Sequence, residues 1–168
     1  MAYKIKINDN ILLSIYYYII GGEKNVDFLD FRSSQQGATG NLASGNGTFL
    51  GDIGLIVGNA ANIRVGLSAT IGINAAGEPP VLTFYILRNI PAAQITTTFN
   101  SSNIIYTNTQ EVSLSGAPLF FTIAAADFNP SSSNTEPGQI NYSLWVASST
   151  PNVALSGPQT FWGIATAQ

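Results

Sequence analysis

The amino-acid sequence predicts an all-β protein, a two-sheet antiparallel sandwich of the jelly-roll type with an N-terminal β arm. Short stretches with a β-strand pattern recur at regular spacing, and turn segments such as NAAGEPP, NPSSSNTEPG and SSTPN separate them. No stretch of useful length has helical periodicity, and about eight short strands favour a sandwich. The expected strands are Thr48–Val57, Ala61–Asn74, Val81–Ile90, Gln94–Phe99, Asn103–Thr107, Leu119–Ala125, Gln139–Ser148 and Pro158–Ala165.

The composition limits the kinds of function that the chain can have. The chain has 168 residues, enough for one domain with a real core. Only 9% of the residues are charged, against about 25% in an ordinary domain, whereas 45% are hydrophobic. A surface of small neutral polar groups repels copies of itself weakly, which suits a protein packed among neighbours. The net charge of −3 and six Lys plus Arg argue against nucleic-acid binding.

The residue types leave little for catalysis. The chain has no His and no Cys, which excludes imidazole bases, thiol nucleophiles, disulfides and zinc sites with N or S ligands. The carboxylates lie mostly in expected loops or at strand ends, and no pattern selects a pair of them. We expect no enzyme activity, no catalytic residues, no cofactor and no metal site.

Residues 1–22 form the expected arm. Tyr3–Asn8 alternates apolar and polar residues, as a strand does. Ile11–Ile20 has half of the about 20 residues that a membrane helix needs. No A-x-A cleavage site follows, which argues against a signal peptide. The arm either pairs within its own domain or adds a strand to a neighbouring subunit. Its contact residues would be Ile11, Leu12, Leu13, Ile15, Tyr16, Tyr18, Ile19 and Ile20.

The segment that follows differs in composition from both its neighbours. Residues 23–47 are rich in Gly, Ser, Gln and Asn, which predicts a tether. A short apolar island, Val26–Phe31, is expected to dock locally. Residues 48–168 then form the jelly-roll domain.

Two strands predict an oligomer interface. Both faces of Val81–Arg88 are apolar, and the same holds for Leu119–Ala125. Because a sandwich strand has one inward face, the other apolar face is expected to meet a second subunit. We also expect Arg64 and Arg88 to pair with a carboxylate such as Glu111 or Asp127. The expected interface residues are Leu82, Phe84, Ile86, Arg88 and Phe120.

Three aromatic residues are candidates for a ligand platform. Tyr142, Trp145 and Trp162 lie on strands near the C-terminus and have the ring surface on which sugars stack. Tryptophan in a sandwich more often belongs to the core or to an interface, so both alternatives stay open.

Two segments resemble spore-surface proteins of endospore-forming bacteria. In Ile63–Asn89, a strand pair around a turn ends in a TF-x-I-x-R stretch. In Gln139–Gln168, a final hairpin carries Y-x-L-x-V and GP-x-TF-x-G-x-A strands. The resemblance covers about residues 48–168. It implies a trimeric jelly roll like the tumour-necrosis-factor and complement-type domains. In the appendage subunits of this family, a short N-terminal segment can insert into the next subunit.

The resemblance leads to a structural expectation. We expect a self-assembling subunit of a spore-surface filament or layer, made without a classical signal peptide and without a membrane span. Its partners would be copies of itself, as trimers or head-to-tail polymers, with other spore-surface proteins as further partners. The chain lacks Gly-X-Y repeats and cysteines, so its assembly would be non-covalent. The alternatives are a trimeric head that binds carbohydrate or another surface, and an extracellular or virion jelly roll of a viral or phage fibre or capsid.

Overall fold

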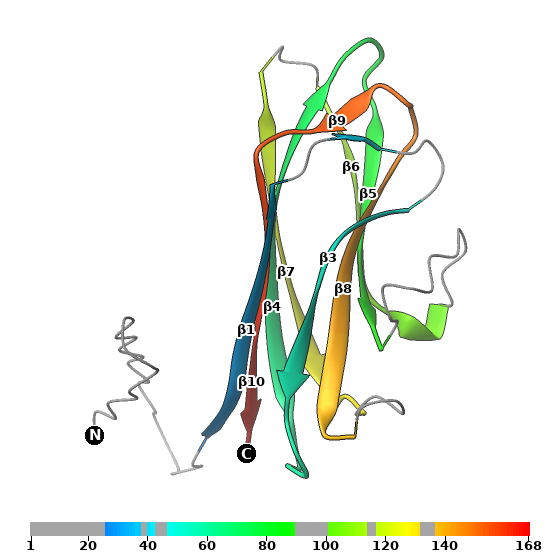
Figure 1. The fold of residues 1–168 in the computed structure, drawn as a ribbon. Helices are drawn as coiled ribbons and strands as arrows, with labels where there is room; N and C mark the ends of the chain where they lie inside the picture. The colour runs from blue at the N-terminus through cyan, green and yellow to red at the C-terminus, as the bar shows by residue number, and fades with distance from the viewer. Residues whose placement is uncertain (1–25, 38–39, 43–46, 90–100, 114–116, 132–136) are drawn as a thin grey trace, which may run out of the picture.

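The computed structural model describes residues 26–37, 40–42, 47–89, 101–113, 117–131 and 137–168 (Figure 1). These ranges contain one 3-10 turn, Ser101–Asn103, and no helix there is long and apolar enough to cross a membrane. The expected arm, residues 1–22, and the expected strand Gln94–Phe99 lie outside the described residues. The strands are β1 (Asp27–Gly37), β2 (Gly40–Asn41), β3 (Thr48–Ile56), β4 (Arg64–Ala75), β5 (Val81–Arg88), β6 (Ile104–Glu111), β7 (Leu119–Phe128), β8 (Gln139–Ser148), β9 (Val153–Leu155) and β10 (Pro158–Ala167).

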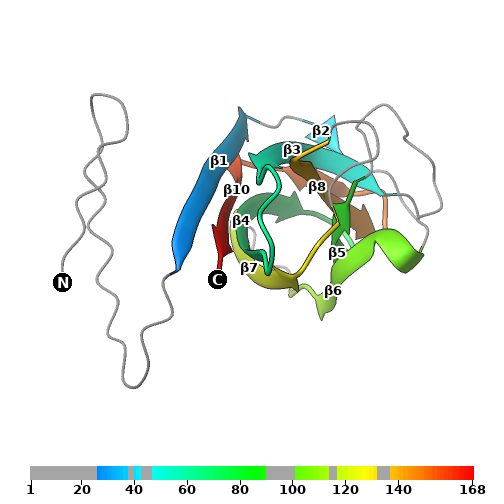
Figure 2. The same cartoon turned by 90° about the horizontal axis from the view of Figure 1, so that it is seen from below.

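The strand order confirms the predicted fold class. One antiparallel sheet has the long strands in the order β1-β10-β4-β7. The short strand β9 pairs with the C-terminal end of β4, and β2 pairs with β9. The other sheet has the order β3-β8-β5-β6. When the eight long strands are counted along the chain, the sheets read 1-8-3-6 and 2-7-4-5. This double Greek key is the jelly-roll order. Figure 2, which looks along the strands, shows the two sheets facing each other.

The predicted tether over residues 23–47 is wrong for most of its length. Asp27–Gly37 forms β1, which pairs with β10 from Asp27↔Ala167 to Gly37↔Pro158. Its Ser and Gln residues hide the strand from sequence analysis, because an edge strand is held by backbone hydrogen bonds and needs no continuous apolar pattern. The sandwich therefore includes β1 as well as the residues from Thr48 onward.

The core lies between the two sheets. Along β4, alternate residues are buried and the residues between them face outward, as the sequence pattern predicts. The ring centroids of Phe84 on β5 and Phe121 on β7 lie 5.3 Å apart across the core. The inward residues of β4 and β5 are Val65, Leu67, Ala69, Ile71, Ile73, Leu82, Phe84 and Ile86.

The predicted oligomer interface is wrong for three residues of β5. Leu82, Phe84 and Ile86 are fully buried within the chain's own sandwich. They face the opposite sheet, so they are core residues and are closed to a second subunit. Phe120, the interface candidate on β7, is exposed to 61%. Arg88 takes part in a polar network inside the molecule, described below.

Candidate functional site

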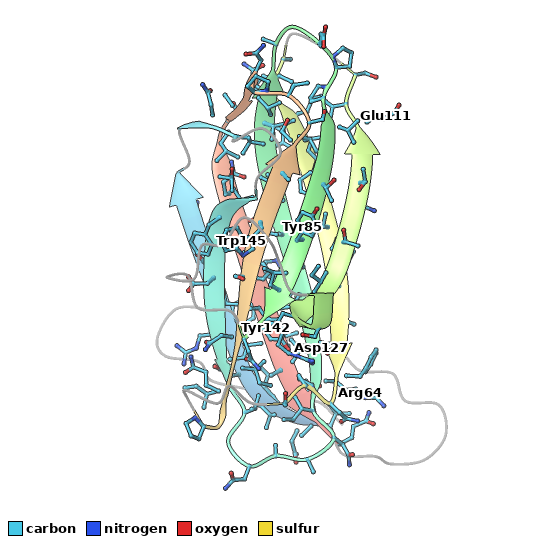
Figure 3. The ribbon with its side chains drawn as sticks, turned by 90° about the vertical axis from the view of Figure 1, so that its right-hand side faces the viewer. Arg64, Tyr85, Glu111, Asp127, Tyr142 and Trp145 are labelled. Carbon is cyan, nitrogen blue, oxygen red and sulfur yellow. The ribbon has the colours of Figure 1, made fainter. Side chains whose placement is uncertain are left out.

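A buried polar network joins the two sheets at one end of the sandwich (Figure 3). Arg88 on β5 donates from Nη1 to both carboxylate oxygens of Asp127 on β7, at 3.2 and 3.0 Å. The hydroxyl of Tyr142 on β8 donates to Asp127 Oδ2 at 3.0 Å. The sequence-based prediction that Arg88 pairs with Glu111 or Asp127 is confirmed for Asp127. Both partners are largely buried, so the ion pair is shielded from solvent between the two sheets.

Tyr142 stays protonated in this network. Burial raises the pKa of its hydroxyl far above the ordinary value. The negative charge of Asp127 and the hydrogen bond to it raise this pKa further, and the positive charge of Arg88 lowers it. The hydroxyl therefore keeps its proton near neutral pH and donates it in the hydrogen bond to Asp127.

Arg64 does not have the predicted carboxylate partner within the described residues. Its guanidinium lies over the ring of Phe128, with 5.8 Å between Cζ and the ring centroid. Arg64 and Phe128 are paired in the β4–β7 ladder, which places both side chains on the outward face of the sheet. The arginine therefore covers an exposed aromatic ring.

The predicted ligand platform is wrong for two of its three residues. Tyr142 points into the core, and Trp145 is only 1% exposed. The Trp145 indole donates from Nε1 to Ser143 Oγ at 2.8 Å and packs edge-on against Phe49. Trp162 alone remains partly exposed, with its ring 6.0 Å from that of Phe31. No sugar platform is assembled from these three side chains.

The structure reveals a larger feature, the outward face of β1, β10, β4 and β7, which we call the outer face. Directly opposed residues in antiparallel ladders point to the same side of the sheet. The ladder registers therefore define four rows across these strands. The rows are Phe28–Thr166–Arg64–Phe128, Phe31–Ile164–Gly66–Ala126, Ser33–Trp162–Ser68–Ala124 and Gln35–Thr160–Thr70–Thr122.

The outer face is apolar at its borders and almost uncharged. Five of the large hydrophobic side chains that are exposed in the described residues lie on it or at its end: Phe28, Phe31, Phe120, Phe128 and Trp162. Several other positions of the face hold small residues, among them Gly66, Ser68 and Ala124. Arg64 is the single charged residue in the four rows. Phe28 and Phe31 belong to the apolar island Val26–Phe31, but their place on a sheet was not predicted because β1 was not predicted. Phe120 and Phe128 are eight residues apart on β7, and this even spacing places them on the same face of the strand.

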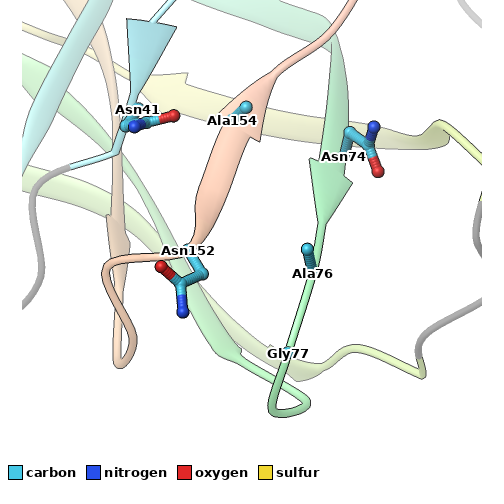
Figure 4. Close-up of a pocket in the computed structure, with 6 residues that line it drawn as sticks. All are labelled: Asn41, Asn74, Ala76, Gly77, Asn152 and Ala154. Atoms are coloured by element: carbon cyan, nitrogen blue, oxygen red, sulfur yellow. The ribbon is translucent and has the colours of Figure 1, made fainter.

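A second surface feature is an open hollow of about 330 Å³ at the end of the sandwich where β2, β4 and β9 meet (Figure 4). Its lining is neutral: three asparagines, two alanines and a glycine. No sequence pattern pointed to it, because the three asparagines are far apart along the chain. Among the described residues, no group of three or more carboxylates converges to hold a metal ion. The lining residues are Asn41, Asn74, Ala76, Gly77, Asn152 and Ala154.

Comparisons with known proteins do not assign the chain to a family. No family model and no curated protein matches the chain. Among solved structures, the chain is similar to one in the structure of the infectious bursal disease virus Gx strain, with 9% identity and a TM-score of 0.35. The match covers 97% of this chain and 37% of that one, so this chain spans little more than a third of the other's length. The fold assignment therefore rests on the strand order.

Proposed function

We propose that the protein is a structural, self-assembling subunit whose copies pack against one another through the outer face. The observation that carries this proposal is that five exposed aromatic side chains lie on, or at the end of, one almost uncharged face of a sheet. Large exposed apolar patches on a folded domain mark association sites. Aromatic residues supply most of the energy of such contacts, because each buries a large area at low cost in side-chain entropy.

A second copy of the chain is the partner that this face fits best. Four strands about 4.8 Å apart and about ten residues long give a face on the order of 600 Å² in projection. This is comparable with the roughly 800 Å² that each partner buries in a stable interface of ordinary size. The lone Arg64 lies beside Phe128, so two such faces meet without a cluster of like charges.

The resemblance to spore-surface proteins supports a location and a form for this assembly. We propose a non-covalent filament or layer on the endospore surface, in which residues 11–20 connect each subunit to the next. This connection is heterologous, and heterologous contacts that do not close produce open filaments. Burial of several aliphatic side chains of this segment would contribute roughly 10 kcal/mol before the cost of ordering the segment.

Negative-stain electron microscopy and light scattering of the full chain test the proposal. The comparison includes a chain that starts at Glu23 and the double variant Phe120→Ser/Phe128→Ser. Ile56→Ser is the matched control, because Ile56 is also exposed but lies on β3, away from the outer face. We expect filaments or layers from the full chain and from the control, and dispersed particles from the double variant. A full chain that stays monomeric at all concentrations overturns the proposal.

The two contacts are separable in the same experiment. If the Glu23 chain disperses while the double variant still assembles, the N-terminal segment holds the polymer and the outer face does not. If both disperse, the polymer needs both contacts.

A further inference from the structure

The hollow between β2, β4 and β9 has a regular construction that follows from strand register. Asn41 on β2 and Asn74 on β4 are both paired with Ala154 on β9. Paired residues point to the same face, so the three side chains stand in a row with the alanine in the middle. The two amides are two strand spacings apart, roughly 10 Å. Figure 4 shows this row.

A second row lies beside the first. Asn152 directly precedes β9 and Ala76 directly follows β4, and both line the same hollow. The Ala76 amide donates to the Asn152 carbonyl at 3.1 Å, which holds the two segments together. Gly77 has a φ of +88°, and a Cβ there would lie 3.4 Å from Asn152 Nδ2. The glycine therefore makes the turn and keeps the space beside this amide open.

The three asparagine side chains are available to a ligand. None of them makes a side-chain hydrogen bond to any described residue, whereas Asn62, Asn89, Asn103 and Asn141 all do. Each carboxamide offers two donor hydrogens and a carbonyl acceptor. The floor between them consists of the methyl groups of Ala76 and Ala154. No charged residue lines the hollow.

We propose that this hollow binds a neutral sugar ring. A pyranose has an apolar face of C–H groups, which fits over the alanine methyls, and peripheral hydroxyls, which both donate and accept hydrogen bonds as carboxamides do. The volume lies near the lower end of the roughly 300–1,000 Å³ that ligand sites occupy, which suits one or two rings. A charged ligand would find no side chain of opposite charge in the lining. This inference does not depend on the proposed assembly.

The test is a titration of the ¹⁵N-labelled full-length Phe120→Ser/Phe128→Ser variant, which should stay dispersed, followed by NMR of the asparagine side-chain amides. The probes are methyl α-glucopyranoside, methyl α-mannopyranoside, methyl β-galactopyranoside and N-acetylglucosamine, with inorganic phosphate as the charged control. We expect saturable shifts of the Asn41, Asn74 and Asn152 amides with at least one sugar and none with phosphate. The absence of saturable shifts with every sugar up to roughly 10 mM, ten times a 1 mM Kd, overturns the proposal.

Variants distinguish this site from weak binding elsewhere. Asn74→Ala and Asn152→Ala each remove a neutral hydrogen-bonding group and should weaken the apparent Kd at least about threefold. Ala154→Phe fills the floor and should abolish binding. Asn59→Ala is the matched control, an exposed asparagine in the turn between β3 and β4, and should bind as the unaltered chain does. Shifts that persist in Ala154→Phe and in both asparagine variants place the sugar elsewhere and also overturn the proposal.

Discussion

The hydroxyl of Tyr142 on β8 lies 3.0 Å from Asp127 Oδ2 on β7, and this hydrogen bond joins the two sheets of the sandwich. Arg88 approaches the same carboxylate from β5. The only buried carboxylate among the described residues thus has donors on two strands of the opposite sheet. We expect this arrangement to contribute to stability and not to chemistry.

Tyr142→Phe should lower the free energy of unfolding by about 1.5–3 kcal/mol, because it removes a buried hydrogen bond to a charged group. Urea denaturation measures this loss. The matched control is Tyr106→Phe, since no hydrogen bond of the partly buried Tyr106 hydroxyl is found among the described residues. Equal effects of the two substitutions would contradict the role given to the Tyr142 hydroxyl.

The raised pKa of Tyr142 predicts a loss of stability at alkaline pH. In the unfolded chain this tyrosine ionises near its ordinary pKa of about 10, whereas in the folded protein it keeps its proton. Above pH 10 the folded state therefore binds more protons than the unfolded state, and the free energy of unfolding falls as pH rises. The contribution of this group falls by up to about 1.4 kcal/mol for each pH unit. Tyr142→Phe should lack this component when its denaturation curves between pH 9 and 11 are compared with those of the unaltered chain.

Substitutions of Phe84 and Phe120 distinguish a core position from a surface position. Phe84→Ala should cost about 3–5 kcal/mol, because it leaves a cavity between the sheets. Phe120→Ala should cost less than about 1 kcal/mol, since that ring is mostly exposed. Thermal unfolding measures both. A small effect at Phe84, together with a change in oligomeric state, would restore the interface that the sequence predicts there.

Removal of β1 should unfold the domain, whereas removal of the residues before it should not. A chain that starts at Gly40 loses the whole β1–β10 ladder and the packing of Phe31 against Trp162. A chain that starts at Glu23 keeps both. Far-UV circular dichroism and urea denaturation distinguish them, and equal stability of the two chains would show that the tether was predicted correctly.

Gly72 is expected to tolerate no side chain. A Cβ there would overlap the carbonyl oxygen of Ser156 and lie 2.9 Å from Phe120 Cε1. Gly72→Ala should therefore destabilise the protein by about 1–3 kcal/mol. Gly66→Ala, on the same face of β4, meets only Ile164 at an ordinary 3.4 Å and serves as the control. A neutral Gly72→Ala in thermal unfolding would show that the Ser156 segment moves freely.

The sequence predicted those features of the fold that depend on neighbouring residues in the chain. Strict alternation in Ala61–Asn74 identified β4 and its inward face, because side chains of a strand alternate between its two sides. Turn residues also separated seven of the predicted strands as the structure has them, β3 to β8 and β10. The pairing of Arg88 with Asp127 was also predicted, because an arginine at the end of an apolar strand usually has a carboxylate partner.

What the sequence by itself determined is therefore the class of fold and the absence of His and Cys chemistry. Only the tertiary structure decided that polar Asp27–Gly37 is a strand, that Leu82 and Phe84 are core, and that Trp145 is covered. Pairing and burial depend on partners distant in the chain, and no local pattern records them. The same holds for the row of Asn41, Ala154 and Asn74, which exists because two ladders share one strand.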